Sequence, residues 1–225
     1  ASDWIAKAIQ SCGCHPDRVF VVPGNHDVDL DLTGEEAKTY LNDVNTAEDD
    51  KLAETIDAVR ANQKKVGFLR ARLMAFREFA AQYGPQHINR NQADWSVPLV
   101  KWSGLLELHL VGLTSVLLSK GKDDYGRLVL LPNPRGSLAE RAGIEYVVMM
   151  HHPPNWYRNR REITQLLEAR ARVCLSGHEH EARIEVVKNA GERVRLQVFA
   201  VVLDDSLCYC SAENFNYFCI EVFPV

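Results

Sequence analysis

The sequence predicts a layered α/β or α+β sandwich, and three features of its apolar pattern support that class. Short apolar runs typical of buried strands alternate with helical stretches through the first 175 residues. A charged helical stretch separates the first run from the others, and the last third is rich in strand-favouring residues. We therefore expect a single domain at residues 1–225, in which strands are flanked by helices and residues 33–84 form a helical insertion.

The chain is expected to begin with a helix at residues 3–11 and a buried strand at residues 19–22. Trp4, Ile5 and Ile9 share one face of the helix, while Val19 to Val22 form a continuous apolar run. The run ends at Pro23-Gly24. The polar residues that follow would stand at the carboxyl end of a strand, where α/β proteins commonly build sites.

The remaining elements follow from apolar spacing and turn residues. Apolar residues recur at helical spacing among many charges in residues 33–84. Strands are then expected at residues 97–101, 106–113, 127–131, 145–150 and 172–175, with helices at 137–142 and 161–171. Antiparallel strands are expected at residues 183–187, 193–202, 206–210 and 217–222.

The composition is that of an ordinary globular protein. Hydrophobic residues make up 46% and charged residues 25%, which excludes disordered and fibrous classes. The formal net charge of −4 supplies no global reason to bind nucleic acid, although a local basic groove is compatible with that sum. No apolar run reaches membrane-spanning length, no signal-peptide pattern opens the chain, and the two C-x-C pairs lack zinc spacing. We expect a soluble cytoplasmic protein with reduced cysteines, without membrane partners.

Five of the eight histidines fall in three clusters, each directly after a predicted strand. A single histidine beside a strand is usually structural, but three such clusters are typical of a functional site. The clusters are His26, His151 with His152, and His178 with His180. We expect the other three, His15, His87 and His109, to be structural.

The three clusters lie in motifs that together resemble a known family. Gly24-Asn25-His26-Asp27, Met150-His151-His152-Pro153 and Gly177-His178-Glu179-His180 resemble the third, fourth and fifth signatures of the calcineurin-like metallophosphoesterases, in that order. The resemblance extends over nearly the whole chain. It implies a metallophosphoesterase β-sandwich flanked by helices, with two divalent metal ions (Mn, Fe, Zn or Mg) as cofactors.

The resemblance also implies roles for individual residues. Asn25, His151 and His178 would ligate one metal ion and His180 the other, a mixed nitrogen and oxygen set that suits Zn, Mn or Fe. His26 would act on the leaving group or on the charge of the transition state, and Asp27 would orient His26. The alternative for Asp27 is a plain turn or capping carboxylate.

Two choices within the later motifs depend on local geometry. We prefer His151 to His152 as the ligand because His151 directly follows the strand, which leaves His152 to support the site or to bind substrate. His178 and His180 are expected to point to one side of an extended segment, with Glu179 turned away. Trp156 either covers the site or packs in the core.

Two signatures of the family, D-x-H and G-D, are not found in the sequence. In the family they supply the bridging aspartate and most ligands of one metal ion. We therefore expect the natural protein to include a preceding βαβ unit that this chain lacks.

The leading functional hypothesis is hydrolysis of a phosphate ester, preferably a phosphodiester, through metal-bound hydroxide. A nuclease acting on DNA or RNA is one alternative, because basic residues of the insertion are suited to bind phosphates. The same residues could equally form i,i+4 ion pairs on a solvated helix face, which we favour. These basic residues are Arg60, Lys64, Lys65, Arg70, Arg72 and Arg77. A catalytically inactive regulatory or scaffold module is the other alternative, motivated by the absent aspartates. Against it, a cluster of polar residues is costly to bury for folding alone.

Overall fold

A six-stranded mixed sheet organises the protein, in the order β1-β2-β3-β4-β6-β5. The structure is a computed structural model that describes residues 2–32, 35–84, 94–102, 106–121, 124–131, 134–179, 183–188 and 194–199. The strands are β1 (Trp95–Trp102), β2 (Leu106–Leu113), β3 (Ile144–Met150), β4 (Ala171–Ser176), β5 (Arg183–Lys188) and β6 (Val194–Phe199). The predicted α/β class is confirmed, while the strands expected at 206–210 and 217–222 lie outside the described residues.

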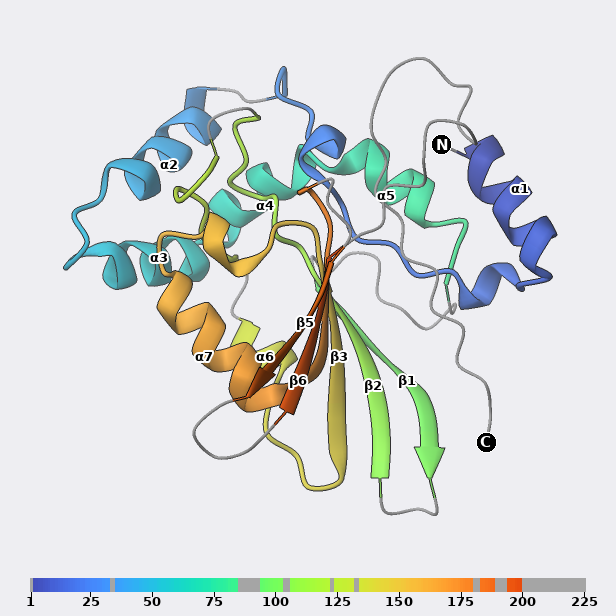
Figure 1. Cartoon of the computed structure of the whole chain (residues 1–225). Helices are drawn as coiled ribbons and strands as arrows, with labels where there is room; N and C mark the ends of the chain where they lie inside the picture. The colour runs from blue at the N-terminus through green and yellow to red at the C-terminus, as the bar shows by residue number, and fades with distance from the viewer. Residues whose placement is uncertain are drawn as a thin grey trace.

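Helices flank the sheet, and α2, α3 and α7 gather on one side of it while α1 lies on the other (Figure 1). The α-helices are α1 (Ser2–Cys12), α2 (Glu35–Thr46), α3 (Leu52–Ala61), α4 (Gln63–Ala71), α5 (Met74–Ala80), α6 (Pro134–Ser137) and α7 (Arg160–Arg170). Short 3-10 helices are η1 (Pro16–Arg18), η2 (Asn25–Asp27) and η3 (Pro154–Trp156). Among the described helices, none has the length and apolar character to span a bilayer.

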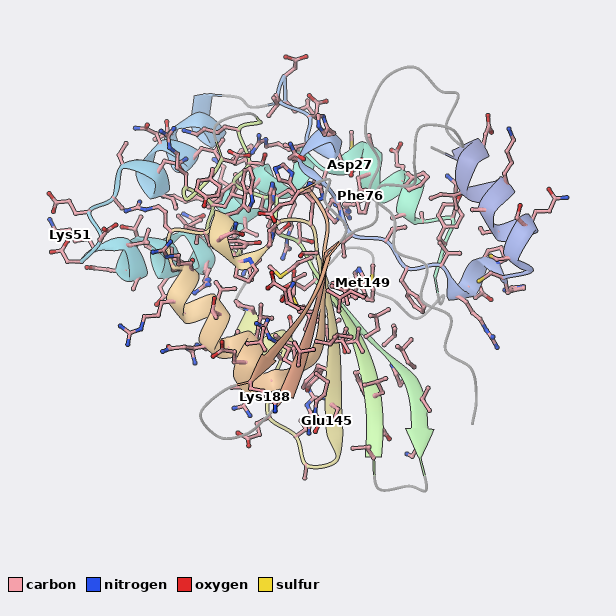
Figure 2. The ribbon with its side chains drawn as sticks, viewed as in Figure 1. Asp27, Lys51, Phe76, Glu145, Met149 and Lys188 are labelled. Atoms are coloured by element: carbon pink, nitrogen blue, oxygen red, sulfur yellow. The ribbon has the colours of Figure 1, made fainter. Side chains whose placement is uncertain are left out.

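The central strands β2, β3, β4 and β6 are parallel, and the edge strands β1 and β5 pair antiparallel with their neighbours. The carboxyl ends of β2, β3 and β4 therefore meet at one end of the sheet. Figure 2 shows Asp27 near that end, toward which Met149 lies, and shows Glu145 and Lys188 at the opposite end. The loops after these strands can therefore form a site together with η2.

The sheet buries both faces, and β3 shows how. Val148 and Met150 belong to the cluster that packs against Ile163 of α7, while Val147 and Met149 belong to a cluster on the opposite face. Alternate residues of a strand point to opposite faces, so a strand buried on both sides needs a continuous apolar run. This is why the β3 run could be predicted from the sequence.

Two predicted strands were wrong. Residues 19–22 form no ladder among the described residues; Phe20 and Val22 instead pack beside Trp95, whose indole Nε1 donates to the Val21 carbonyl at 3.3 Å. The apolar run predicts that this segment is buried, but it does not show whether another strand pairs with it.

Among the described residues, 127–131 form no strand but an isolated bridge, between Leu128 and Tyr157. Leu128 and Leu130 enter the core beneath α7, whereas Val129 and Leu131 enter the core of the helices α2 to α4. The alternate burial of these residues in two clusters therefore shows that the segment lies between two cores. The helix expected at 137–142 is found earlier, as α6, which begins at Pro134 because proline is favoured in a first turn.

Candidate metal and active site

The loop that follows β3 is held by a serine from the loop after β2. The buried Ser115 hydroxyl oxygen accepts hydrogen bonds from the backbone N–H groups of His151 and His152, each at 3.2 Å. Both histidines lie just beyond the last paired residues of the sheet, Leu113 and Met150. Ser115 thereby satisfies donors that the ladder no longer pairs.

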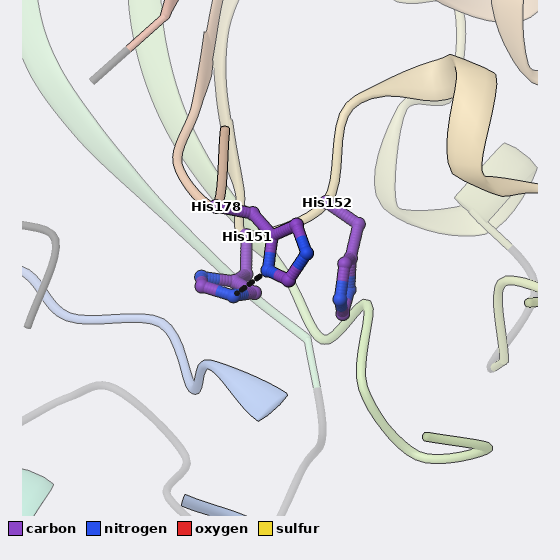
Figure 3. A group of neighbouring side chains, drawn as sticks. All are labelled: His151, His152 and His178. Carbon is purple, nitrogen blue, oxygen red and sulfur yellow. Dashed lines mark hydrogen bonds between the residues drawn. The ribbon is translucent and has the colours of Figure 1, made fainter. Parts of the chain in front are cut away.

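Asn25, His151 and His178 converge from three separate loops. The Nε2 atom of His151 lies 2.9 Å from the Oδ1 atom of Asn25 and 3.0 Å from the Nδ1 atom of His178. Figure 3 shows the contact between the two imidazoles, with His152 beside them. One amide oxygen and two ring nitrogens therefore meet in a half-buried position.

Gly24 permits this convergence because it leaves room for the His151 ring. A Cβ atom at position 24 would lie 3.0 Å from Cε1 and 3.1 Å from Nδ1 of His151, closer than ordinary contact. The φ angle of Gly24 is −94°, so the requirement here is for space and not for a left-handed backbone.

His178 adopts a backbone conformation that the sequence did not predict. Its φ angle is +71°, and the N–H of Glu179 donates to the carbonyl of Gly177 at 2.9 Å. These features define the rarer, positive-φ kind of γ-turn. The expectation of an extended segment was therefore wrong at His178, because the chain turns as it leaves β4. Such a conformation costs about 1–3 kcal/mol in a non-glycine residue and persists only where the surroundings impose it.

His152 is packed behind this pair, with 0% of its surface exposed. Its Nδ1 atom lies 3.5 Å from the Ser115 hydroxyl, and within the described part of the chain its Nε2 atom has no hydrogen-bond partner. Burial, reinforced by His151 and His178, lowers the pKa of His152 well below its usual value. His152 is accordingly a neutral imidazole at neutral pH.

Trp156 covers the histidines from the η3 side. Its ring centroid lies 4.1 Å from that of His178 and 5.3 Å from that of His152, and exposed Tyr125 packs against it in a T-shaped arrangement. Trp156 also packs against the core cluster that includes Ile163 of α7, so the structure combines the two roles considered for it. An aromatic wall excludes water and thereby strengthens the polar interactions behind it.

The donor set fits a divalent metal ion. The ligand atoms of His151, His152 and His178 all lie within 4.8 Å of one another, and the amide oxygen of Asn25 joins the first of them. Imidazole nitrogens with an amide oxygen suit Zn, Mn and Fe better than Ca or Mg. Unprotonated imidazole is also the form that binds metal, which the lowered pKa of His152 favours for that residue.

The family model for calcineurin-like phosphoesterases matches residues 1–182. The chain belongs to the calcineurin-like phosphoesterase family. No curated protein matches it. Membership of this family indicates a metal-dependent phosphoester hydrolase, and the resemblance inferred from the three motifs is confirmed.

Within this calcineurin-like phosphoesterase, the structure brings together most residues predicted from the motifs. Asn25, His151 and His178 are in contact, and His26 is exposed on η2 beside Asn25. The Asp27 carboxylate accepts the N–H of Gly24 at 2.8 Å, which is the capping interaction considered as its alternative role. His180 lies outside the described residues.

Two residues at the site were missed by sequence reasoning. Ser115 stands two residues after the end of β2, so its place at a strand's carboxyl end was a usable signal. Glu179 accepts hydrogen bonds from the side chains of Asn155 and Trp156. No spacing rule predicts those contacts, which join loops more than twenty residues apart.

Proposed function

We propose that this protein hydrolyses phosphodiesters, with Asn25, His151 and His178 as ligands of one divalent metal ion and His180 as a ligand of a second. The observation that supports it best is the convergence of Asn25 Oδ1 and His178 Nδ1 on His151 Nε2, at 2.9 and 3.0 Å. Divalent cations in such a site supply Lewis-acid activation of the phosphate ester.

The chain's own residues would carry the remaining work. Asn25, His151 and His178 would hold one ion, which could bind the phosphate, while Trp156 and buried His152 would exclude water from one side. Hydrolysis breaks the bond from phosphorus to the leaving oxygen and forms a bond from phosphorus to a water oxygen, and the water releases a proton to the solvent. Exposed His26 would donate a proton to that leaving oxygen, with Asp27 fixing the turn that presents His26.

Two arginines of the helical segment, Arg60 and Arg72, do not favour the nuclease alternative. Arg72 is 1% exposed and donates to the carbonyls of Leu117 and Ser119, and Arg60 donates to the carbonyl of Leu130. These two side chains serve the packing of the helices against the segments that follow β2. They are therefore not offered to a nucleic-acid backbone.

The proposal is tested by measuring metal content and turnover of bis-p-nitrophenyl phosphate in matched variants. Asn25→Ala should weaken metal binding, whereas His26→Ala should keep the metal and lower turnover by about 10²–10⁴-fold. His15→Ala is the control, because His15 is an exposed histidine that pairs with Asp17. Unchanged metal binding in Asn25→Ala, or unchanged turnover in His26→Ala, would refute the assigned roles.

A further inference from the structure

The carboxylate of Glu179 joins the loop after β4 to the 3-10 helix η3. Its Oε1 atom accepts hydrogen bonds from Nδ2 of Asn155 at 2.9 Å and from Nε1 of Trp156 at 3.3 Å. Both donors belong to η3, which begins at Pro154 and follows Pro153. Two consecutive prolines restrict the backbone there, so the donors sit on a stiff support.

The same contacts surround a strained residue. His178, which directly precedes Glu179, has a φ angle of +71° at the centre of the γ-turn closed by the Glu179 N–H and the Gly177 carbonyl. On one side the N–H of Gly177 donates to the His151 carbonyl at 2.9 Å, which anchors the turn to the loop after β3. On the other side the Glu179 carboxylate anchors it to η3.

The turn controls where the His178 ring points. With this backbone, Nδ1 of His178 lies 3.0 Å from Nε2 of His151, and the ring lies against Trp156. Relaxation of His178 to a negative φ would redirect its Cβ and carry the ring away from His151. A strained conformation needs such external constraints, and Glu179 supplies two of them.

We propose that Glu179 is a positioning residue for the metal site: its hydrogen bonds to Asn155 and Trp156 hold His178 in the strained turn that aims Nδ1 at the metal. This inference rests on the proposed function, since it takes His178 as a metal ligand. Glu179 acts by accepting hydrogen bonds and not through its charge. A glutamine, whose side-chain carbonyl accepts from the same two donors, should therefore replace it.

The test compares Glu179→Ala with Glu179→Gln in the purified protein, with Co²⁺ as the probe. Co²⁺ affinity is measured by titration, the visible absorption spectrum reports the ligand geometry, and thermal melting of the metal-free protein reports stability. Glu179→Ala should weaken Co²⁺ binding by about 10–100-fold and alter the spectrum. Glu179→Gln should stay within about threefold of the wild type, because rescue by the amide is what a hydrogen-bond acceptor predicts.

Two further variants separate this inference from the proposed function. Glu162→Ala is the matched control, because the Glu162 carboxylate also accepts hydrogen bonds from two side chains, those of Arg135 and Asn159. It should leave Co²⁺ affinity unchanged. His151→Ala should abolish Co²⁺ binding at the site, and if it does not, the proposed function itself fails.

Other outcomes bear on Glu179 alone. If His151→Ala loses the metal but Glu179→Ala binds it as the wild type does, the positioning role is overturned. If Glu179→Gln is as weak as Glu179→Ala, charge and not hydrogen bonding is responsible, and the inference is likewise overturned.

Discussion

Replacement of Gly24 by alanine should disable the metal site without unfolding the protein. The added Cβ would lie 3.0 Å from Cε1 and 3.1 Å from Nδ1 of His151, whereas ordinary contacts begin near 3.4 Å. The His151 ring must therefore move by several tenths of an ångström. Its Nε2 atom, now 2.9 Å from Asn25 Oδ1 and 3.0 Å from His178 Nδ1, would move with it.

The structural and functional effects of this change can be separated by magnitude. Gly24 has a φ angle of −94°, which alanine adopts without strain, and the loss of glycine stabilises by about 0.4–1 kcal/mol through the unfolded state. The steric contact offsets this gain, so the free energy of unfolding should change by less than about 1 kcal/mol. Displacement of a metal ligand should weaken metal affinity by about 10–100-fold.

The assay pairs metal titration with urea unfolding, and Gly67→Ala serves as the control. A Cβ at Gly67, in the middle of α4, would meet no atom within 4 Å, so this variant should gain about 0.5–1 kcal/mol and keep its metal affinity. Wild-type metal affinity in Gly24→Ala would refute the argument that His151 is held against Gly24 as a ligand.

Two predictions concern buried charged groups. Burial raises the pKa of Asp94 to about 7 from 3.8, although Thr114 N–H and Ser137 Oγ donate to it. The pKa of Asp94 is higher in the folded than in the unfolded protein, so the folded state is favoured at low pH. The free energy of unfolding should therefore fall by roughly 4 kcal/mol as the pH rises from about 4 to about 7. Asp94→Asn should remove that loss, and urea unfolding with the wild-type pH slope in this variant would contradict it. Arg72→Ala should lower the free energy of unfolding by roughly 2–4 kcal/mol, because it leaves the Leu117 and Ser119 carbonyls without their donor. Arg72→Met keeps the volume of the side chain, so its free energy of unfolding should fall by less. Equal decreases in the two variants would assign the effect to hydrogen bonding alone.

The parts of the fold that sequence predicted are those in which burial and pairing coincide. The runs at β3 and β4 are central strands of the sheet, so their apolar residues meet both neighbouring strands and packed helices. Residues 19–22 and 127–131 have the same apolar character but no ladder among the described residues. Apolar pattern reports that a segment is buried, while pairing depends on which other segment reaches it.

The candidate site shows the same division. His151 and His178 were predictable because they follow the expected strands β3 and β4, and a parallel sheet brings such ends together. Asn25 was predicted from its motif, although residues 19–22 before it form no ladder among the described residues. The turn at His178 was not predictable, because a φ angle of +71° is uncommon in any single non-glycine residue. The turn is held on one side by the N–H of Gly177, which donates to the His151 carbonyl. On the other side it is held by Asn155 and Trp156, which donate to Glu179 from another loop.

The supports of the two proposed histidine ligands, His151 and His178, differ in kind, and that difference has a physical reason. His151 leaves β3 where its N–H would otherwise be unpaired, and the Ser115 hydroxyl replaces the missing ladder partner without strain. His178 must turn back from β4 toward His151, so it needs a conformation that only surrounding contacts maintain. A ligand at the end of a strand can therefore be fixed by one hydrogen-bond acceptor, whereas a ligand in a strained turn depends on a second loop. The metal affinity of this site should consequently be more sensitive to changes around η3 than to conservative changes along β3.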